Sequence, residues 1–282
     1  MKITASIVTY NSAKEITNVL DSLLQANVFN LEIYVVDNAS TDNTCQIVTD
    51  QYPQTKLIAS EKNLGFGGGH NLALDQVDSD YHIFINPDIT VEKGEIEKMI
   101  SYMEQNSDTV ILTPRVLNTD GTEQLLPKRT PKFKYLFGGR LENKLKIARR
   151  WRSEYTMREA KIAEPIQIDF CTGCFMFCRT SALKSIGGFD DRYFLYFEDA
   201  DLTREMQKLG KTMYVPHVTV THEWKRENGK ISKGFFIALH SMFKYFWKWK
   251  NDKAKKDNSV NGNKVVQSNT PDQRSEIEKV EK

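Results

Sequence analysis

The sequence lacks any run of about 18 uncharged apolar residues, the length that a membrane-spanning helix requires. Its N-terminus enters a strand pattern directly and is not organised as a signal peptide, so we expect a cytosolic protein. Excess charge is missing too, because the 282 residues carry a formal net charge of only +2. Overall charge therefore gives no support for a nucleic-acid-binding protein. Hydrophobic residues make up 40% of the chain, enough for one large α/β domain or two small ones.

Cysteine is scarce: the chain has Cys45, Cys171, Cys174 and Cys178. The last three lie in an apolar, strand-like segment, residues 168–178. Strand alternation places Cys171 on one face and the other two on the opposite face, with Cys174 and Cys178 about 13 Å apart. Three thiolates so arranged cannot share one zinc ion, and the sequence therefore predicts buried free thiols.

Glycine is absent from the turn after the first predicted strand, Ile3–Val8. That turn reads Thr-Tyr-Asn-Ser at positions 9–12, whereas a dinucleotide-binding dehydrogenase needs a glycine-rich turn there. A sugar-nucleotide pyrophosphorylase would need a glycine-rich loop containing lysine at the same place. The glycine run at 65–69 follows a third, short strand and lacks the required context. The sequence therefore disfavours both enzyme classes.

Strands and helices alternate along the chain. The expected strands of the first part are Ile3–Val8, Leu31–Val36, Lys56–Ala59 and Tyr81–Ile85. Helical patterns and short connections lie between them, which predicts an α/β fold with a central, mostly parallel sheet and helices on both faces. Later elements are expected as a helix over 92–103, a strand over 110–113, a strand pair over 166–178 broken at Thr172-Gly173, and short strands over 212–215 and 218–221.

Asp88 follows the apolar strand Tyr81–Ile85 through the turn Asn86-Pro87. It therefore lies just past the carboxyl end of a central strand, where open α/β sheets bind ligands. A carboxylate there can hold a divalent metal, which would in turn hold a diphosphate. The alternative is that Asp88 caps a helix beginning near Val91.

Two more acidic points follow strands or begin helices. Asp37 ends the second strand, so it should lie beside Asp88 at one edge of the parallel sheet. The pair Glu198-Asp199 begins a helix, where the charged form of an acid is favoured and the carboxylate is available as a base. A metal-held diphosphate leaving group and a carboxylate base are what glycosyl transfer from a nucleotide sugar requires.

Several motifs occur together in a recognisable order. They are Ser-Ile-Val-Thr-Tyr-Asn at 6–11, Val-Val-Asp-Asn-Ala-Ser-Thr-Asp at 35–42, Asn-Leu-Gly-Phe-Gly-Gly-Gly-His-Asn at 63–71, Asn-Pro-Asp at 86–88, Gly-Gly-Phe-Asp at 187–190 and Tyr-Phe-Glu-Asp-Ala-Asp-Leu at 196–202. Over about residues 1–224 the chain resembles the inverting, family-2 glycosyltransferases of the GT-A fold. It is most similar to the bacterial rhamnosyltransferase-like subgroup, which builds O-antigen, capsule and cell-wall polysaccharides.

The resemblance implies a role for each motif. The nucleotide pocket would be lined by Thr9, Tyr10, Asn11, Asp37, Asn38, Asn63, Gly65, Asn71 and Asn86. Asp37 would hold the edge of the base, and residues 63–71 would wrap the nucleotide. Asp88 would bind Mg²⁺ or Mn²⁺ as the surviving ligand of the family's Asp-x-Asp, whose first position here is the neutral Asn86. His222 would be a C-terminal metal ligand, with a purely structural histidine as the alternative.

The remaining implied roles concern the acceptor and the chemistry. Asp199 would be the catalytic base, and Glu198 would support it or contact the acceptor, together with Thr172 and Gly173. The best-matching donor is dTDP-rhamnose, with a UDP-hexose as the alternative. A lipid-linked glycan is the expected acceptor. A non-catalytic, nucleotide-sugar-binding scaffold is the alternative of another class.

We expect a glycosyltransferase domain over 1–224, divided into a nucleotide-sugar-binding half, 1–114, and an acceptor-binding half, 115–224. The second half contains a basic insert, 126–158, with interleaved aromatic residues. An amphipathic helix over 225–250 and a disordered tail over 251–282 would follow.

The basic insert could be a solvated face, a site for single-stranded nucleic acid or a surface for anionic lipid. The helix Phe235–Trp249, also basic and aromatic, favours lipid over nucleic acid. Its apolar stripe would comprise Phe235, Leu239, Phe243, Phe246 and Trp249. A core role is the strong alternative for its first half and a weaker one after Tyr245. The expected location is therefore the inner face of the cell membrane, as a peripheral protein.

Overall fold

The computed structural model describes residues 1–135, 141–142, 144–223 and 233–250, so the expected tail over 251–282 lies outside the described part. Its strands are β1 Ile3–Thr9, β2 Leu31–Asp37, β3 Lys56–Ala59, β4 Tyr81–Ile85, β5 Ile89–Thr90, β6 Thr109–Leu117, β7 Glu123–Gln124, β8 Ile166–Gln167, β9 Phe175–Arg179 and β10 Lys211–His222. Its helices are α1 Ile16–Ala26, α2 Thr44–Gln51, α3 Gly65–Leu74, α4 Glu95–Gln105, α6 Lys146–Tyr155, α7 Thr180–Ile186, α8 Glu198–Met206 and α9 Lys233–Lys248. No helix within these ranges is both long enough and apolar enough to cross a bilayer.

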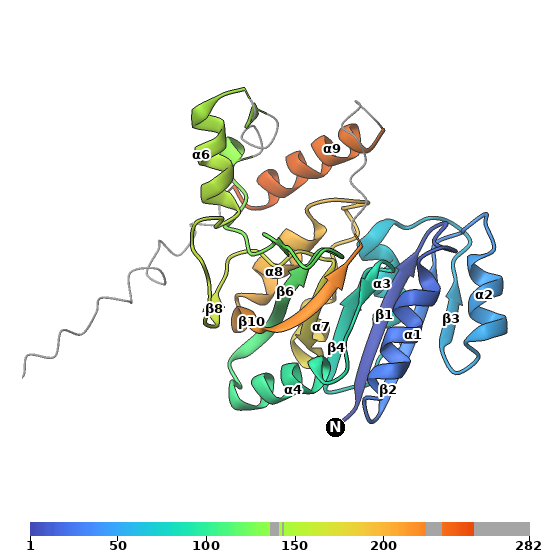
Figure 1. The fold of residues 1–282 in the computed structure, drawn as a ribbon. Coiled ribbons are helices and arrows are strands. Elements are labelled where there is room, and N and C mark those ends of the chain that lie inside the picture. The colour runs from blue at the N-terminus through green and yellow to red at the C-terminus, as the bar shows by residue number, and fades with distance from the viewer. Residues whose placement is uncertain (136–140, 143, 224–232, 251–282) are drawn as a thin grey trace, which may run out of the picture. The chain divides into compact units, whose positions relative to one another are not determined.

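The strands form one sheet in the order β3-β2-β1-β4-β9-β6-β10-β5 (Figure 1). The strands β3, β2, β1 and β4 are parallel, with Thr9 opposite Asp37 and Ile7 opposite Ile85. Their carboxyl ends therefore meet at one edge, which we call the carboxyl edge. The strand β9 runs antiparallel between β4 and β6, so it begins at this same edge. The predicted α/β fold is confirmed.

Apolar side chains cover both faces of the sheet. Alternation along β4 sends Ile83 and Ile85 into one core and Phe84 into the other. The first core is closed by α1, α2 and α4, and the second by α3, α7 and α8 (Figure 1). Burial on both faces explains why β4 reads as a continuous apolar run.

Some predicted boundaries were wrong. The helix expected from residue 92 begins at Glu95, because the chain first forms the short strand β5. The helix expected after Asn71 already begins at Gly65. Residues 211–222 form one strand with an irregularity between Val215 and Thr219, where two strands were expected. Sequence periodicity does not predict these pairings. The strand β10 continues past its irregularity because both of its parts pair with β6.

The cysteines are free, as predicted, but the assignment of their faces was wrong. Cys171 and Cys178 lie in the same core, and Cys174 lies in the other. The alternation fails because residues 168–174 are not a regular strand. Burial raises the pKa of the Cys174 thiol to about 12, so this side chain remains a protonated thiol at neutral pH.

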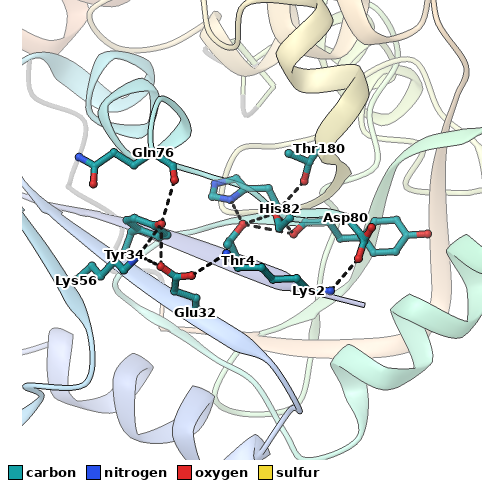
Figure 2. Close-up of polar contacts among 11 residues, drawn as sticks. Lys2, Thr4, Glu32, Tyr34, Lys56, Gln76, Asp80, His82 and Thr180 are labelled. Carbon is teal, nitrogen blue, oxygen red and sulfur yellow. Dashed lines mark hydrogen bonds and ion pairs between the residues drawn. The ribbon is translucent and has the colours of Figure 1, made fainter.

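A buried polar network ties the first strands together at the edge opposite the carboxyl edge (Figure 2). Thr4 Oγ1 lies 2.7 Å from His82 Nδ1 and 2.8 Å from Ser79 Oγ. Ser6 Oγ continues the network to His82 Nε2 at 2.8 Å and to His70 Nδ1 at 2.7 Å. Burial lowers the pKa of His82 to about 3, so it is neutral and structural.

Candidate active site

The ends of β1 and β2 are bound to each other at the carboxyl edge. Thr9 Oγ1 donates to Asp37 Oδ1 at 3.1 Å, and the Asn38 amide donates to the Thr9 carbonyl at 2.8 Å. The second oxygen of Asp37 accepts the Ser40 amide at 2.9 Å. Both Thr9 and Asp37 are buried, so the fold itself holds the Asp37 carboxylate in place.

The loop after β1 is shaped by Asn11, which has a positive φ of 54°. Asparagine tolerates this conformation better than most residues. Its side-chain oxygen accepts the Thr41 amide at 2.8 Å, and its own amide donates to Ser40 Oγ at 2.8 Å. Next to it, the Tyr10 side chain is exposed. The loop therefore joins the two strand ends and presents an aromatic ring to solvent.

The glycine-rich segment, residues 63–71, is hydrogen-bonded to the loop after β2. Asn38 Nδ2 donates to the Gly65 carbonyl at 2.8 Å, and Asn63 Oδ1 accepts the Gly65 amide at 2.8 Å. Gly65 has φ +77°, and a Cβ there would lie 1.8 Å from the Phe194 carbonyl oxygen. Only glycine permits this close approach of the two backbones.

Asn71 has a different place from the other predicted nucleotide residues. Its Nδ2 donates to the Phe189 carbonyl at 2.8 Å and to Asp191 at 2.9 Å, and its Oδ1 accepts the Phe189 amide at 2.9 Å. With both ends of the amide engaged, Asn71 holds the turn after α7. Its predicted contact with the nucleotide stays a prediction.

A cleft of about 330 Å³ opens between these loops and the end of β4. It is lined by Val8, Tyr10, Ser12, Glu15, Phe66, Asn86, Pro87, Asp88 and Glu223. Predicted nucleotide and metal residues thus share one cavity. Another cleft, of about 460 Å³, lies around Asp80, Glu104 and Arg179 and contains none of the predicted site residues.

Asp88 and His222, far apart in the sequence, meet at this edge. The strand β5 directly follows Asp88 and pairs antiparallel with the end of β10, which places His222 opposite Ile89. His222 Nε2 then lies 3.2 Å from Asp88 Oδ1. The possibility that Asp88 caps a helix was wrong, because α4 begins after Gly94.

Gln124 decides which nitrogen of His222 carries a proton. Its Nε2 donates to Asn118 Oδ1 at 2.8 Å and to the His222 carbonyl at 3.0 Å, which turns its Oε1 toward the imidazole. His222 Nδ1 lies 2.9 Å from that oxygen and must therefore donate to it. A neutral His222 then has a bare lone pair on Nε2, facing Asp88.

These atoms fit a cation. Asp88 Oδ1 and His222 Nε2 are buried, and neither has a hydrogen-bond partner in the part of the chain that the structure describes. Two acceptors 3.2 Å apart repel unless a positive charge joins them, either a proton on the imidazole or a divalent metal. Protein groups alone supply few ligands, because among the described residues no three His, Cys, Asp or Glu side chains cluster for a metal. A diphosphate and water would have to complete the coordination.

Asp199 lies at the start of α8, next to the turn that precedes β9. The two residues before Glu198 are held in a strained conformation, with φ of 69° at Tyr196 and 70° at Phe197. Asp199 Oδ2 accepts the Gly173 amide at 3.1 Å, and Oδ1 accepts the Ala200 amide at 2.8 Å. The side chain is half-buried, so a substrate hydroxyl can reach it.

The electrostatics of the acidic pair differ from the expectation that helix position favours the charged form. Burial raises the pKa of Asp199, with Lys128 and the backbone amides opposing it. Burial, and then the charge of Asp199, also raise the pKa of Glu198. Desolvation therefore outweighs the helix N-terminus here, and Asp199 becomes a stronger base than an exposed aspartate.

Thr172 and Gly173 connect the two sides of the site. The Asn86 amide donates to the Cys174 carbonyl at 3.0 Å, which joins the turn before β9 to the end of β4. A Cβ on Gly173 would lie 3.0 Å from the Phe66 ring and 3.4 Å from Asp199 Cβ. Thr172 Oγ1 donates to the Leu126 carbonyl at 3.2 Å, so it supports the turn.

Sequence reasoning gave no indication of the role of Gln124, and it placed Lys128 only within the basic insert, residues 126–158.

The helix α9 packs on the loop that leads to Asp199. Ser241 Oγ donates to the Leu195 carbonyl at 2.9 Å, and the rings of Tyr245 and Phe197 lie 5.4 Å apart. Of the predicted apolar stripe, Phe243 is exposed at 59%, Trp249 is buried, and Phe235, Leu239 and Phe246 are half-buried. Two aromatic residues outside the stripe, Phe236 and Trp247, are exposed at 64% and 66%. The chain divides into the units Met1–Tyr245 and Phe246–Lys282, and only residues 246–250 of the second unit are described.

The model of the family "Glycosyl transferase family 2" matches residues 4–187 of the chain. The chain belongs to this glycosyltransferase family. A similar family-2 relative is the N-acetylglucosaminyl-diphospho-decaprenol L-rhamnosyltransferase of Mycobacterium tuberculosis, 27% identical over 83% of this chain and 80% of that protein. The rhamnosyltransferase WbbL of Escherichia coli K12 is 30% identical over 64% of this chain and 69% of its own length.

Solved structures show the same fold for this family-2 glycosyltransferase. GalNAc-T7, solved with UDP, GalNAc and Mn²⁺, has a TM-score of 0.67 at 14% identity and covers 89% of this chain and 48% of that chain. TarS of S. aureus has a TM-score of 0.56 at 19% identity and covers 91% of this chain and 75% of its own. The expected GT-A fold is confirmed.

Proposed function

We propose that this glycosyltransferase moves L-rhamnose from dTDP-rhamnose to a hydroxyl of a lipid-linked glycan, with inversion. The observation that carries the chemistry is the placing of the Asp88–His222 pair and Asp199 around one edge of the sheet. The sugar and the acceptor rest on the named activities of the relatives from M. tuberculosis and E. coli. A UDP-hexose donor is the alternative.

The donor side would bind the nucleotide diphosphate. Asp37 would hold the edge of the base. The other residues that would line the pocket are Thr9, Tyr10, Asn11, Asn38, Asn63, Gly65, Asn71 and Asn86, of which Tyr10 and Asn86 line the cleft at the end of β4. Asp88 and His222 would hold Mg²⁺ or Mn²⁺, which supplies charge neutralisation for the departing diphosphate when it is bound. Gln124 would keep His222 in the tautomer that this requires.

The acceptor side would supply the base. Asp199 would take the proton from the acceptor hydroxyl as that hydroxyl attacks the anomeric carbon opposite the diphosphate. Its raised pKa improves the match to the hydroxyl, and the amides of Gly173 and Ala200 fix its orientation. Glu198, buried beside it and with a raised pKa, would contact the acceptor as a neutral acid.

A donor screen tests this function. Release of dTDP, UDP and GDP from a panel of nucleotide sugars is measured with an N-acetylglucosaminyl-diphospho-lipid acceptor and without it. We expect acceptor-dependent release from dTDP-rhamnose. Release of UDP from a UDP-hexose, with no release of dTDP from dTDP-rhamnose, would show that the donor is a UDP-hexose. Binding of a nucleotide sugar without transfer to any acceptor would favour the non-catalytic scaffold.

We further propose that the enzyme docks on an anionic membrane surface and does not bind nucleic acid. Support comes from the aromatic residues of α9, since Phe236, Phe243 and Trp247 are spaced by seven and four residues and so share one helix face. Lysines flank this face, and aromatic rings with lysines suit the headgroup layer. Each cation near an anionic surface contributes about 1 kcal/mol, so several together hold a protein reversibly.

Vesicle co-sedimentation tests the docking. Changing Phe236, Phe243 and Trp247 together to serine should abolish binding to anionic vesicles. The matched control is Phe29→Ser, because Phe29 is 84% exposed and lies before β2, away from the carboxyl edge. Equal binding of the wild-type chain to neutral and anionic vesicles would show that the charge of the lipid does not contribute to docking. Unchanged binding of the triple variant would remove α9 from the proposal.

A further inference from the structure

Lys128 enters the acceptor side of the site from the basic insert. It forms a bridge with Phe170, whose amide donates to the Lys128 carbonyl at 3.1 Å. Phe170 leads directly into the turn whose Gly173 amide binds Asp199. The Lys128 ammonium lies 4.9 Å from the centre of the Phe170 ring, a cation–π distance that fixes the side chain.

Among the residues that the structure describes, none of opposite charge is in contact with this ammonium. Within the described ranges, Lys128 makes no side-chain hydrogen bond and no ion pair, although it is half-buried. Burial lowers its pKa, Asp199 raises it, and a second cation, Arg152, lowers it again. A desolvated cation without a partner is costly, so the site favours an anion.

Arg152 lies in the last turn of α6. Its guanidinium lies 6.0 Å from the centre of the buried Tyr155 ring. The chain pairs these segments through the backbone, because the Arg129 amide donates to the Tyr155 carbonyl at 3.0 Å. No described carboxylate forms an ion pair with Arg152. Lys128 and Arg152 each lie over an aromatic ring, and the charges of Arg152 and Asp199 both act on the pKa of Lys128.

We propose that Lys128 and Arg152 bind the phosphoryl groups of a diphosphate-bearing acceptor, next to the hydroxyl that Asp199 deprotonates. Lysine and arginine are the side chains that best bind phosphate oxygens. The Asp88–His222 pair would bind the donor diphosphate through a metal ion. Lys128 and Arg152 would then bind the second anion of the reaction, the diphosphate of the acceptor. This inference rests on the proposed function, since it assigns the acceptor a negative charge beside the reacting sugar.

The test compares two acceptors that differ only in the diphosphate. One is N-acetylglucosaminyl-diphospho-lipid, and the other is an uncharged alkyl glycoside of N-acetylglucosamine, both in detergent. Lys128→Met and Arg152→Gln should each raise KM for the diphosphate acceptor about ten-fold or more, since each removes a charged hydrogen bond. The KM for the uncharged glycoside and for the donor should change little. Lys128→Arg should keep most of the affinity.

The matched control is Lys132→Met, which removes an exposed lysine from the same segment and should leave both KM values unchanged. A rise in KM for both acceptors alike would give Lys128 a purely structural role and overturn the proposal. A rise in donor KM alone would assign the two cations to the donor diphosphate and also overturn it.

Binding without turnover separates this inference from the proposed function. Calorimetry of inorganic pyrophosphate with the metal-free protein should show binding that Lys128→Met abolishes and Asp88→Ala preserves. Such binding would survive even if the donor were not dTDP-rhamnose. Pyrophosphate binding that depends on Asp88 and ignores Lys128 would refute the anion site.

Discussion

The donor and acceptor sides of the site are built differently. In the loops after β1 and β2 on the donor side, polar groups satisfy one another: Thr9 binds Asp37, and Asn38 binds Gly65. On the acceptor side, Glu198 Oε2 is buried without a partner among the described residues, as are Asp88 Oδ1 and His222 Nε2 at the end of β4. The loops of the donor side are therefore held by their own hydrogen bonds, whereas the acceptor side and the Asp88–His222 pair keep polar atoms that a substrate or a cation can satisfy.

The largest effect should come from the base on the acceptor side. Asp199→Asn should lower kcat by about 10²-fold or more, because the amide cannot take the proton of the hydroxyl. Donor affinity should stay the same, since the Asp199 carboxylate is bound by the amides of Gly173 and Ala200 and not by the loops after β1 and β2 within the described residues. Single-turnover kinetics with a separate donor-binding titration checks both. Near-normal turnover would place the base elsewhere.

The next effect concerns a donor-side residue that only positions another. Gln124→Leu should weaken Mn²⁺ binding about 10- to 100-fold, because His222 loses the acceptor that fixes its tautomer. Gln124→Glu keeps an oxygen there and should retain the affinity. Free Mn²⁺ measured by electron paramagnetic resonance reports this without any turnover.

The control for Gln124 is Gln105→Leu, an exposed glutamine at the end of α4. It should leave Mn²⁺ affinity unchanged. If the Gln124→Leu variant binds Mn²⁺ as tightly as the wild type, then Gln124 does not orient His222.

A stability measurement tests whether the donor side is fixed by packing. Gly65→Ala and Gly121→Ala both place a side chain at positive φ, a strain of about 1–3 kcal/mol. Only Gly65 adds a clash, with the Phe194 carbonyl oxygen, because Gly121 faces open space. Urea denaturation should therefore show a larger loss for Gly65→Ala. Equal losses would mean that the Phe194 loop moves away freely.

The smallest effect is a shift of the pH profile. The raised pKa of Asp199 should place the acid limb of kcat/KM above the range of an ordinary aspartate, because the base must be ionised. Lys128 opposes that rise, so Lys128→Met should move the limb to still higher pH and lower activity on the acid side. A limb that stays in place would show that the charge of Lys128 does not reach Asp199.

The sequence predicted the first four strands and the position of Asp88 just past β4, because both follow from short apolar runs and turn residues. The acceptor side was predicted less well. The exposed face of α9 depends on where Tyr245 packs, and the role of Gln124 depends on the pairing of β7 with β6. Contacts between distant segments decided these points, and no periodicity encodes them.

The pairing of β5 with β10 has a consequence for the order in which the molecule becomes competent. Asp88 belongs to the first part of the chain that a ribosome produces, and His222 emerges only near the end of β10. The loops after β1, β2 and β3 can form while the protein is still being made. The Asp88–His222 pair forms only when β10 has paired with β5. Under the proposed function, manganese binding would therefore report a late step of folding, because it would require the strand pairing that brings His222 to Asp88.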